Sequence, residues 1–332
     1  WEDFMAKNVT TTSIAKRAGV SQSTVSRVIN NYRGINRVKR ESVLAAMREL
    51  GYYANRNVKR RVGIVICPLP EQKKMMALEF FGNQIAAQEA CLQEAEAEST
   101  VINLAAGAAS LGLTPSRLQE LSGVILLNAP SVGLLNSLKE KKIPFVVNTG
   151  AGIPGGIVCD TVGPDEAETC RIGCEYLLAR RPGFGVMISV HNAYRIDGYQ
   201  QELRRRGLPP IPEEDIHIVP STDIAHFIDA THRLIRSGRR PPALIVDFYD
   251  AAAAVRSILA FSGIRVPEDI LLFTYSHSTS QDEIPALLQD PRTLGRKAAR
   301  RMLEILDDPD DPPHHIRIPM TLVNPSDKGE TI

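Results

Sequence analysis

The chain lacks any run of about eighteen apolar residues, which a membrane-spanning helix would need. The sequence also begins without the charged and then apolar segments of a secretory signal. These absences favour a soluble protein of the cytoplasm.

Cysteine is scarce, and no CxxC pair occurs. The five cysteines are scattered through apolar segments and are odd in number, which fits reduced thiols in a core better than a disulfide framework. Cys170 and Cys174 could pair with distant histidines around a metal, but no second ligand pair has zinc-like spacing. We therefore expect no metal and no cofactor.

Sequence signatures of common enzymes are missing as well. No GxxxxGK[ST], HExxH or GxSxG occurs. A formal GxGxxG is present at Gly150, Gly152 and Gly155, but Pro154 interrupts it and the next segment, "IVCD", reads as a strand. No helix N-terminus would then receive a pyrophosphate, so a glycine-rich loop is the better interpretation and we expect no enzyme.

Charge is divided unevenly along the 332 residues. Residues 1–61 hold thirteen Lys and Arg against four Asp and Glu, a balance of +9, whereas the remainder carries −8. A small basic module on an acidic body is typical of binding to a polyanion, and a solvated basic face is the alternative. The length and the 43% hydrophobic content allow two or three folding units.

The basic module, residues 6–54, reads as three short helices. The first begins near Thr10 and ends at Gly19, the second follows Ser21, and the third runs from about 37 to 50. Their apolar positions recur at helical spacing and can form a small core: Ile14, Ala15, Ala18, Val25, Val28, Ile29, Val43, Ala46, Met47 and Leu50.

The second helix presents a polar face away from that core. Two helices joined by a short turn, the second carrying short polar groups and one arginine, have the geometry that fits the major groove of DNA. Gln22 and Arg27 can each make a bidentate contact to a base, whereas Ser21, Thr24 and Asn30 are placed to hold phosphates. A three-helix bundle with a polar face and no DNA to bind is the alternative.

The segments "TTSIAKRAGVSQSTVSRVIN" and "VLAAMRELGYYANR" closely resemble the head of the LacI/GalR family of bacterial regulators. The resemblance implies that bases are contacted by Gln22, Ser23 and Arg27. It implies phosphate contacts from Thr10, Ser21, Thr24, Ser26, Asn30, Asn36 and Asn55. Thr11 departs from the aliphatic residue that is usual there, so the start of the first helix is expected to pack less well.

A short basic linker, residues 55–61, follows the head. Relatives continue from the Asn-Arg pair, here Asn55 and Arg56, into a hinge helix whose apolar residue wedges into the minor groove. Here the linker is several residues shorter, and Arg61 stands where a leucine is expected. We expect Arg56 and Arg61 to enter the minor groove or bind phosphate, unless the segment is only a basic tether.

A first prediction follows for the DNA. An arginine cannot unstack bases as a leucine wedge does. We therefore expect this protein to bend its operator less than its hinge-helix relatives, or to couple its two parts through a stiffer connection. A circular-permutation gel-shift assay measures the bend angle. A complex of a hinge-helix relative with its operator is run on the same gel as a reference. A bend as strong as that of the relative would refute the prediction.

The remainder, residues 62–332, alternates apolar strands with helical segments, as a parallel sheet covered on both faces requires. We expect an effector-binding and dimerisation domain of two doubly wound α/β lobes, about 62–162 plus 291–323 and 163–290, with ligand bound beyond the carboxyl ends of the strands. The expected helices lie near 79–97, 165–180, 195–206, 224–237 and 250–262.

The body resembles, more loosely than the head, the periplasmic-binding-protein-like effector domain of the same family, through "RIDGYQQEL" and "SGIRVPEDI". The resemblance implies an effector site with Arg195, Tyr249, Ser276 and His277. Phe248 could line this site or pack in the core. Neutral Ser276 and His277 stand where relatives have aspartates, which disfavours an ordinary hexose.

We therefore interpret the chain as a transcriptional regulator, a repressor in the bacterial cytoplasm that joins the nucleoid when bound to DNA. The expected partners are a palindromic double-stranded operator, a second copy of the chain, and a sugar or other polar metabolite. Two alternatives remain open. An enzyme could use the α/β lobes but lacks catalytic motifs, and a periplasmic solute carrier would need a signal peptide and would not need the basic head.

Overall fold

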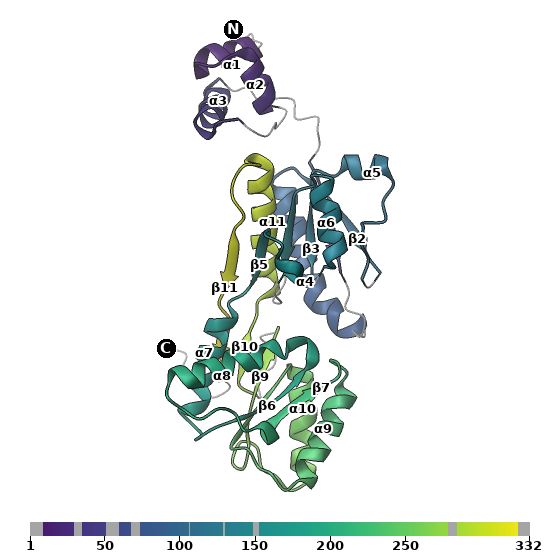
Figure 1. Ribbon diagram of the computed structural model, residues 1–332, viewed down its shortest axis with the longest axis vertical. Coiled ribbons are helices and arrows are strands. Elements are labelled where there is room, and N and C mark those ends of the chain that lie inside the picture. The colour runs from purple at the N-terminus through teal and green to yellow at the C-terminus, as the bar shows by residue number, and fades with distance from the viewer. Residues whose placement is uncertain are drawn as a thin grey trace, which may run out of the picture.

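The computed structural model describes residues 9–29, 35–50, 60–67, 74–105, 107–128, 130–148, 153–277 and 284–324. A small helical head lies beyond one end of a body made of two α/β lobes (Figure 1). This arrangement confirms the predicted fold class. None of the helices in the described ranges is long and apolar enough to cross a membrane.

The head consists of α1 (Thr11–Ala18), α2 (Gln22–Ile29) and α3 (Arg37–Glu49). Thr10 and Ser13 form a reciprocal capping box at the start of α1. Gly19 ends that helix at φ 66°, a left-handed conformation that glycine adopts without steric cost. The buried side chains are those the spacing predicts, namely Ile14, Ala15, Val25, Val28, Val43 and Ala46.

The first lobe is a six-stranded parallel sheet in the order β11-β5-β4-β3-β1-β2. Its strands are β1 (Arg61–Ile66), β2 (Glu98–Asn103), β3 (Gly123–Leu127), β4 (Phe145–Asn148), β5 (Asp160–Pro164) and β11 (His315–Ile318). Its helices are α4 (Lys74–Glu94), α5 (Pro115–Glu120), α6 (Val132–Glu140), α11 (Pro291–Asp307) and the 3-10 helix η1 (Pro154–Gly156).

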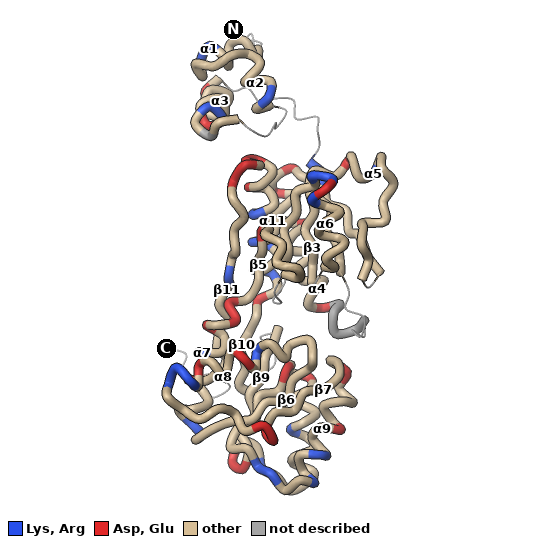
Figure 2. The backbone as a smooth tube through the Cα atoms, in the orientation of Figure 1, with Lys and Arg blue, Asp and Glu red and all other residues tan. Residues whose placement is uncertain are grey.

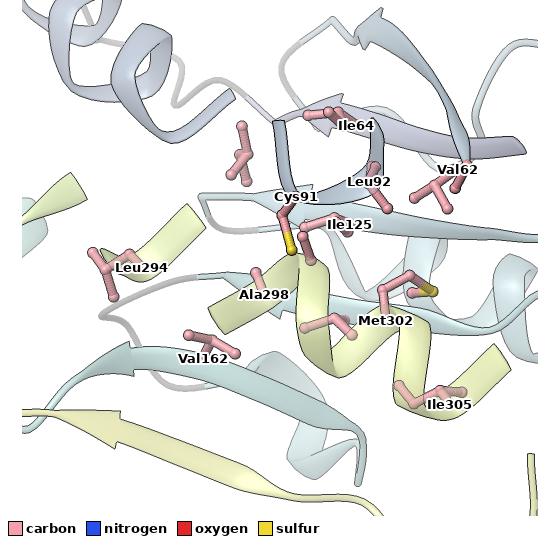
Figure 3. Close-up of a cluster of buried hydrophobic side chains, with 14 of the residues drawn as sticks. Val62, Ile64, Cys91, Leu92, Ile125, Val162, Leu294, Ala298, Met302 and Ile305 are labelled. Atoms are coloured by element: carbon pink, nitrogen blue, oxygen red, sulfur yellow. The ribbon is translucent and has the colours of Figure 1, made fainter. Parts of the chain in front are cut away.

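Both faces of this sheet are buried. Alternate strand residues such as Val62 and Ile64 pack against α4 and α11 (Figure 3), while Val65 and its neighbours pack on the other face. Helices α4 and α11 approach so closely that a side chain at Gly295 would collide with the backbone of Gln84. Glycine at this position therefore allows the two helices to pack directly together.

The second lobe is a six-stranded sheet in the order β12-β10-β9-β8-β6-β7, parallel except for the β10–β12 pair. Its strands are β6 (Gly185–Ser189), β7 (Ile216–Val219), β8 (Ala243–Val246), β9 (Leu271–Ser276), β10 (Ala286–Leu288) and β12 (Thr321–Val323). Its helices are α7 (Glu166–Leu178), α8 (Tyr194–Arg205), α9 (Ile224–Arg236), α10 (Tyr249–Phe261) and the 3-10 helices η2 (Val190–Asn192) and η3 (Glu213–Asp215).

The chain crosses between the two lobes three times. It leaves the first sheet after β5 to enter α7, returns from β10 to α11, and crosses again from β11 to β12. The return of β11 to the first sheet follows the prediction from the sequence. The pairing of residues 321–323 with β10 in the second sheet differs from the expected extent of the first lobe, 291–323.

The five cysteines are free and buried, as the apolar surroundings in the sequence predict. Burial raises the pKa of Cys67 and of Cys170 to about 12, so both are neutral thiols at physiological pH. Within the described ranges, no three His, Cys, Asp or Glu side chains gather closely enough to hold a metal ion.

Candidate nucleic-acid interface and effector site

The outward face of α2 carries the three residues expected to read bases. Gln22, Ser23 and Arg27 are all exposed, whereas Val25 and Val28 on the opposite side of the helix are buried in the head. The helical period thus separates a packing face from a polar face. This face can lie against base edges without disturbing the core.

Hydrogen bonds fix the orientation of several of these side chains. Gln22 Nε2 donates to Thr11 Oγ1 at 2.9 Å, so the polar residue at position 11 holds Gln22. Ser21 Oγ lies 2.9 Å from Ser23 Oγ and 2.8 Å from Thr24 Oγ1. Side chains held in this way lose less conformational freedom when they bind.

The residues expected to hold phosphates have different structural roles in the head. Thr10 and Asn36 cap helices: Thr10 Oγ1 accepts from the Ser13 N–H, and Asn36 Oδ1 accepts from the Val38 N–H at 2.9 Å. Ser26 is exposed on α2. Asn30, Asn55 and Arg56 lie outside the described residues.

Arg61 does not have the role expected of it. It is the first residue of β1, directly beside Glu98 of β2, and its guanidinium pairs with Glu98 at 3.0 Å and with Glu120. Its charge is therefore neutralised within the first lobe. The expectation that Arg61 enters the minor groove or binds phosphate is wrong, because strand pairing places it in the body. The smaller bend of the operator is therefore expected from the short linker and not from Arg61.

The head also contacts the body. We call residues 307–311 at the end of α11 the acidic turn, since it holds four aspartates. Arg40 of α3, which is 3% exposed, donates to the Asp307 carbonyl at 3.5 Å and lies 4.0 Å from the Asp308 carboxylate. Arg60 pairs with Asp307. Figure 2 shows this acidic end of α11 facing the head.

The effector candidates lie at the carboxyl edge of the second sheet. Arg195 is in the first turn of α8, shortly after β6. Tyr249 begins α10, after β8, and Ser276 is the last residue of β9. Carboxyl ends of parallel strands form the ligand edge of doubly wound sheets, so the structure brings these residues to one edge.

Arg195 is buried between two carboxylates. Its Nε and Nη2 donate to Glu166 at 3.0 and 3.1 Å, and its Nη1 lies 3.7 Å from Asp247 Oδ1. The guanidinium also stacks on Tyr275, with Cζ 4.1 Å from the ring centroid. Arg195 is thus held rigidly, and the two carboxylates leave the site with an excess of negative charge.

Further hydrogen bonds hold these partners. Asp247 accepts from the Ser189 N–H at 3.0 Å and from Asn192 Nδ2 at 2.9 Å. The Tyr275 hydroxyl lies 2.5 Å from that of Tyr199. Desolvation raises the pKa of both tyrosines, so both hydroxyls keep their protons at neutral pH.

An aromatic contact joins the two lobes at this edge. The His277 ring lies against Phe80 of α4, with centroids 4.2 Å apart. Desolvation, reinforced by the Arg195 charge, lowers the pKa of His277 to about 4. His277 is therefore neutral at physiological pH and can act as a hydrogen-bonding group. Phe248 packs in the core, edge-on to Phe227 at 5.1 Å.

Sequence reasoning did not identify two of the charged groups that meet Arg195. Glu166 comes from the crossing between lobes, and Asp247 was not among the expected site residues. The only sequence signal for Asp247 is its place directly after an apolar strand. Nothing local to Glu166 indicates its partner.

Two family models match the chain. The model of bacterial regulatory proteins, lacI family, matches residues 10–55, and that of a periplasmic binding protein-like domain matches residues 183–324. The chain belongs to the LacI family of bacterial regulatory proteins. It is a DNA-binding transcriptional regulator with an effector domain.

The similarity to individual members extends over nearly the whole chain. The HTH-type transcriptional regulator CelR of Thermobifida fusca is 27% identical over 88% of this chain and 90% of its own length. The solved lac repressor dimer bound to operator and the anti-inducer ONPF has a TM-score of 0.67 at 21% identity, covering 96% of this chain and 98% of that one. A complex of CelR with cellobiose has a TM-score of 0.65 at 22% identity, covering 95% and 98%.

These relatives are transcriptional regulators, which confirms the prediction that this LacI-family chain is a regulator and not an enzyme.

Proposed function

We propose that this LacI-family protein is a homodimeric repressor of the bacterial cytoplasm that reads a palindromic operator. The observation that carries the proposal is the exposed polar face of α2, with Gln22, Ser23 and Arg27 opposite a fully apolar packing face. The similar lac repressor structure is a dimer on its operator. Two-fold symmetry in such a protein calls for two-fold related half-sites.

The proposed division of labour follows the chain. Residues 6–54 bind DNA, with bases read by Gln22, Ser23 and Arg27 and phosphates held by Ser21, Thr24, Ser26 and neighbouring groups. Residues 55–61 connect the parts, with Arg56 near the DNA. Residues 62–332 bind the effector and form the dimer.

In vitro selection tests the DNA-binding proposal. The full chain is incubated with random duplexes at about 150 mM salt, and bound sequences are amplified over several rounds. We expect enrichment of one inverted repeat whose half-sites are bound by two copies of the chain. Selection of no sequence above the random background would contradict the proposed function.

The effector we propose is a neutral sugar bound at the carboxyl edge of the second sheet. Glu166 and Asp247 supply carboxylates for sugar hydroxyls, which offsets the loss of aspartates at positions 276 and 277. Arg195, Tyr249, Ser276 and neutral His277 complete the polar lining. Two carboxylates against one guanidinium disfavour an anionic ligand. The similar CelR structure is a complex with cellobiose.

A second prediction concerns this selectivity. We expect a neutral mono- or disaccharide from a panel that includes cellobiose to raise the Tm of the full chain by several degrees, and the matching uronic acid to raise it less, because the site is negatively charged. We expect Glu166→Gln to reduce the shift by half or more, since Arg195 loses its bidentate partner.

Glu175→Gln provides the matched control. Glu175 lies on the same helix and pairs with Arg171 at the surface, with a side chain 61% exposed. Its replacement should leave the sugar-induced shift unchanged. Equal Tm shifts from uronic acids and neutral sugars would contradict the assigned site. So would equal sugar-induced Tm shifts in Glu166→Gln and Glu175→Gln.

A further inference from the structure

The contact between the head and the acidic turn joins parts of opposite charge. Residues 302–313, which include the turn, hold five acidic residues and no lysine or arginine, whereas residues 1–61 carry a balance of +9. The red end of α11 lies on the side of the body that faces the head (Figure 2). The turn thus presents to the head the same sign of charge as the phosphates of DNA.

Arg40 is the head residue that makes this contact. It lies three residues before Val43 and six before Ala46, so it continues the buried face of α3, and it is itself 3% exposed. A buried guanidinium is costly unless hydrogen-bond acceptors and a counter-charge surround it. The turn supplies both, because the Asp307 carbonyl lies 3.5 Å from Arg40 Nη1 and the Asp308 carboxylate 4.0 Å from Nε.

The body holds the acidic turn in place. Arg301, which is 1% exposed, donates to the Asp311 carboxylate at 2.5 Å and to the Pro312 carbonyl at 3.1 Å. Its Nε also donates to Asp160 at the start of β5, at 2.6 Å. Strand β5 leads into α7, whose first residue is Glu166 of the effector edge. The turn is therefore a fixed surface for the head, anchored on the segment that also reaches the effector edge.

Arg60 brings a second cation to the turn. Its guanidinium pairs with Asp307, and its carbonyl accepts from the Glu98 N–H at 2.7 Å. It lies directly before β1, where the linker of residues 55–61 reaches the body. The head is thus tethered close to the turn by a short segment. An intramolecular contact of this kind has a high effective concentration, so it forms even when the contact itself is weak.

We propose that the acidic turn is a docking surface for the basic head and that docking competes with DNA. This inference rests on the proposed DNA-binding role of the head. In the docked head, Arg40 is paired and four aspartates lie in the turn beside it, so approaching phosphates are repelled. The head must leave the turn before it binds DNA, which weakens the apparent affinity in proportion to the undocked fraction.

Reciprocal charge reversal tests the proposal. Affinity of the full chain for a random duplex is measured by fluorescence anisotropy at about 100 mM salt, since non-specific binding depends on phosphates and not on an operator. Asp308→Arg repels Arg40, so it should tighten binding about threefold or more. Added to Arg40→Glu, the same substitution restores a pair of opposite charges and should weaken binding relative to Arg40→Glu alone. Added positive charge without docking would tighten binding in both backgrounds.

Glu94→Arg provides the matched control. Glu94 is exposed at the end of α4 in the same lobe, so its replacement makes the same change of charge away from the turn. It should change the affinity by the same factor in both backgrounds. The Tm of each variant shows whether it is folded. If Arg40→Glu lowers the Tm, the cycle is repeated with Arg40→Gln and Asp308→Asn, where Asp308→Asn should tighten binding less once Arg40 is replaced.

The outcomes separate docking from DNA binding. Tighter binding from Asp308→Arg in both backgrounds, or weaker binding from it in the wild-type background, would overturn the docking proposal and leave the DNA-binding function intact. Absence of duplex binding by the wild type and by every variant would contradict the proposed function and the docking proposal together.

Discussion

Replacing both Gln22 and Arg27 by alanine is expected to abolish sequence-specific operator binding while leaving the head folded. Both side chains are exposed on α2, so the core formed by Val25 and Val28 is untouched. A bidentate contact to a base contributes about 1–3 kcal/mol of discrimination, so the pair should weaken specific binding ~30-fold or more. Fluorescence anisotropy with the selected operator, at one fixed salt concentration, measures the loss.

Two comparisons make this result specific to base reading. Affinity for a random duplex should fall only a few-fold, because phosphate contacts remain. Arg204→Ala, which removes an exposed arginine of the second lobe, should leave operator binding unchanged. If the double variant still prefers the operator over a random duplex by the wild-type ratio, α2 does not read the bases.

Replacing Arg301 by methionine is expected to destabilise the protein by about 3–5 kcal/mol. Arg301 is 1% exposed and binds Asp160 through Nε at 2.6 Å, Asp311 through Nη1 at 2.5 Å and the Pro312 carbonyl through Nη2 at 3.1 Å. Without it, the largely buried Asp160 carboxylate loses its guanidinium partner. Urea unfolding followed by circular dichroism measures the change in the free energy of unfolding.

Arg171→Met is the matched control for the same change of side chain. Arg171 also binds two carboxylates, Glu168 at 2.7 Å and Glu175 at 2.6 Å, but its side chain is 40% exposed. Water screens such a pair, so its loss should destabilise the protein far less than the loss of Arg301. Asp160→Asn added to Arg301→Met should recover part of the loss, since it removes the buried charge. Equal losses from the two single variants would show that burial of the Arg301 network contributes nothing.

Local patterns predicted several helices of this chain well, although the segment expected near 79–97 is α4 (Lys74–Glu94), which begins five residues earlier. The expected segments 195–206 and 224–237 correspond to α8 (Tyr194–Arg205) and α9 (Ile224–Arg236), within one residue at each end. The repeating apolar positions and the capping residues that determine these bounds are all near in sequence. The recognition face of α2 could be predicted for the same reason.

Features that depend on distant residues could not be predicted. The sequence-based prediction placed Arg61 near DNA. Its partners Glu98 and Glu120 lie 37 and 59 residues away, and no local pattern indicates them. Glu166 meets Arg195 only because β5 leads into α7 at the crossing between lobes. The three-residue strand β12 has no periodic signal of its own, so its position beside β10 follows from the assembled sheet.

The three crossings between the lobes have a mechanical consequence. A single connection would allow one lobe to rotate about the other in any direction. Three connections restrict the relative motion of the lobes to hinge bending. They permit opening and closing around the effector edge and resist rotation about the long axis of the body. Each lobe is also built from separate stretches of chain, so a protease cut in any one crossing would leave two covalent ties and an intact body.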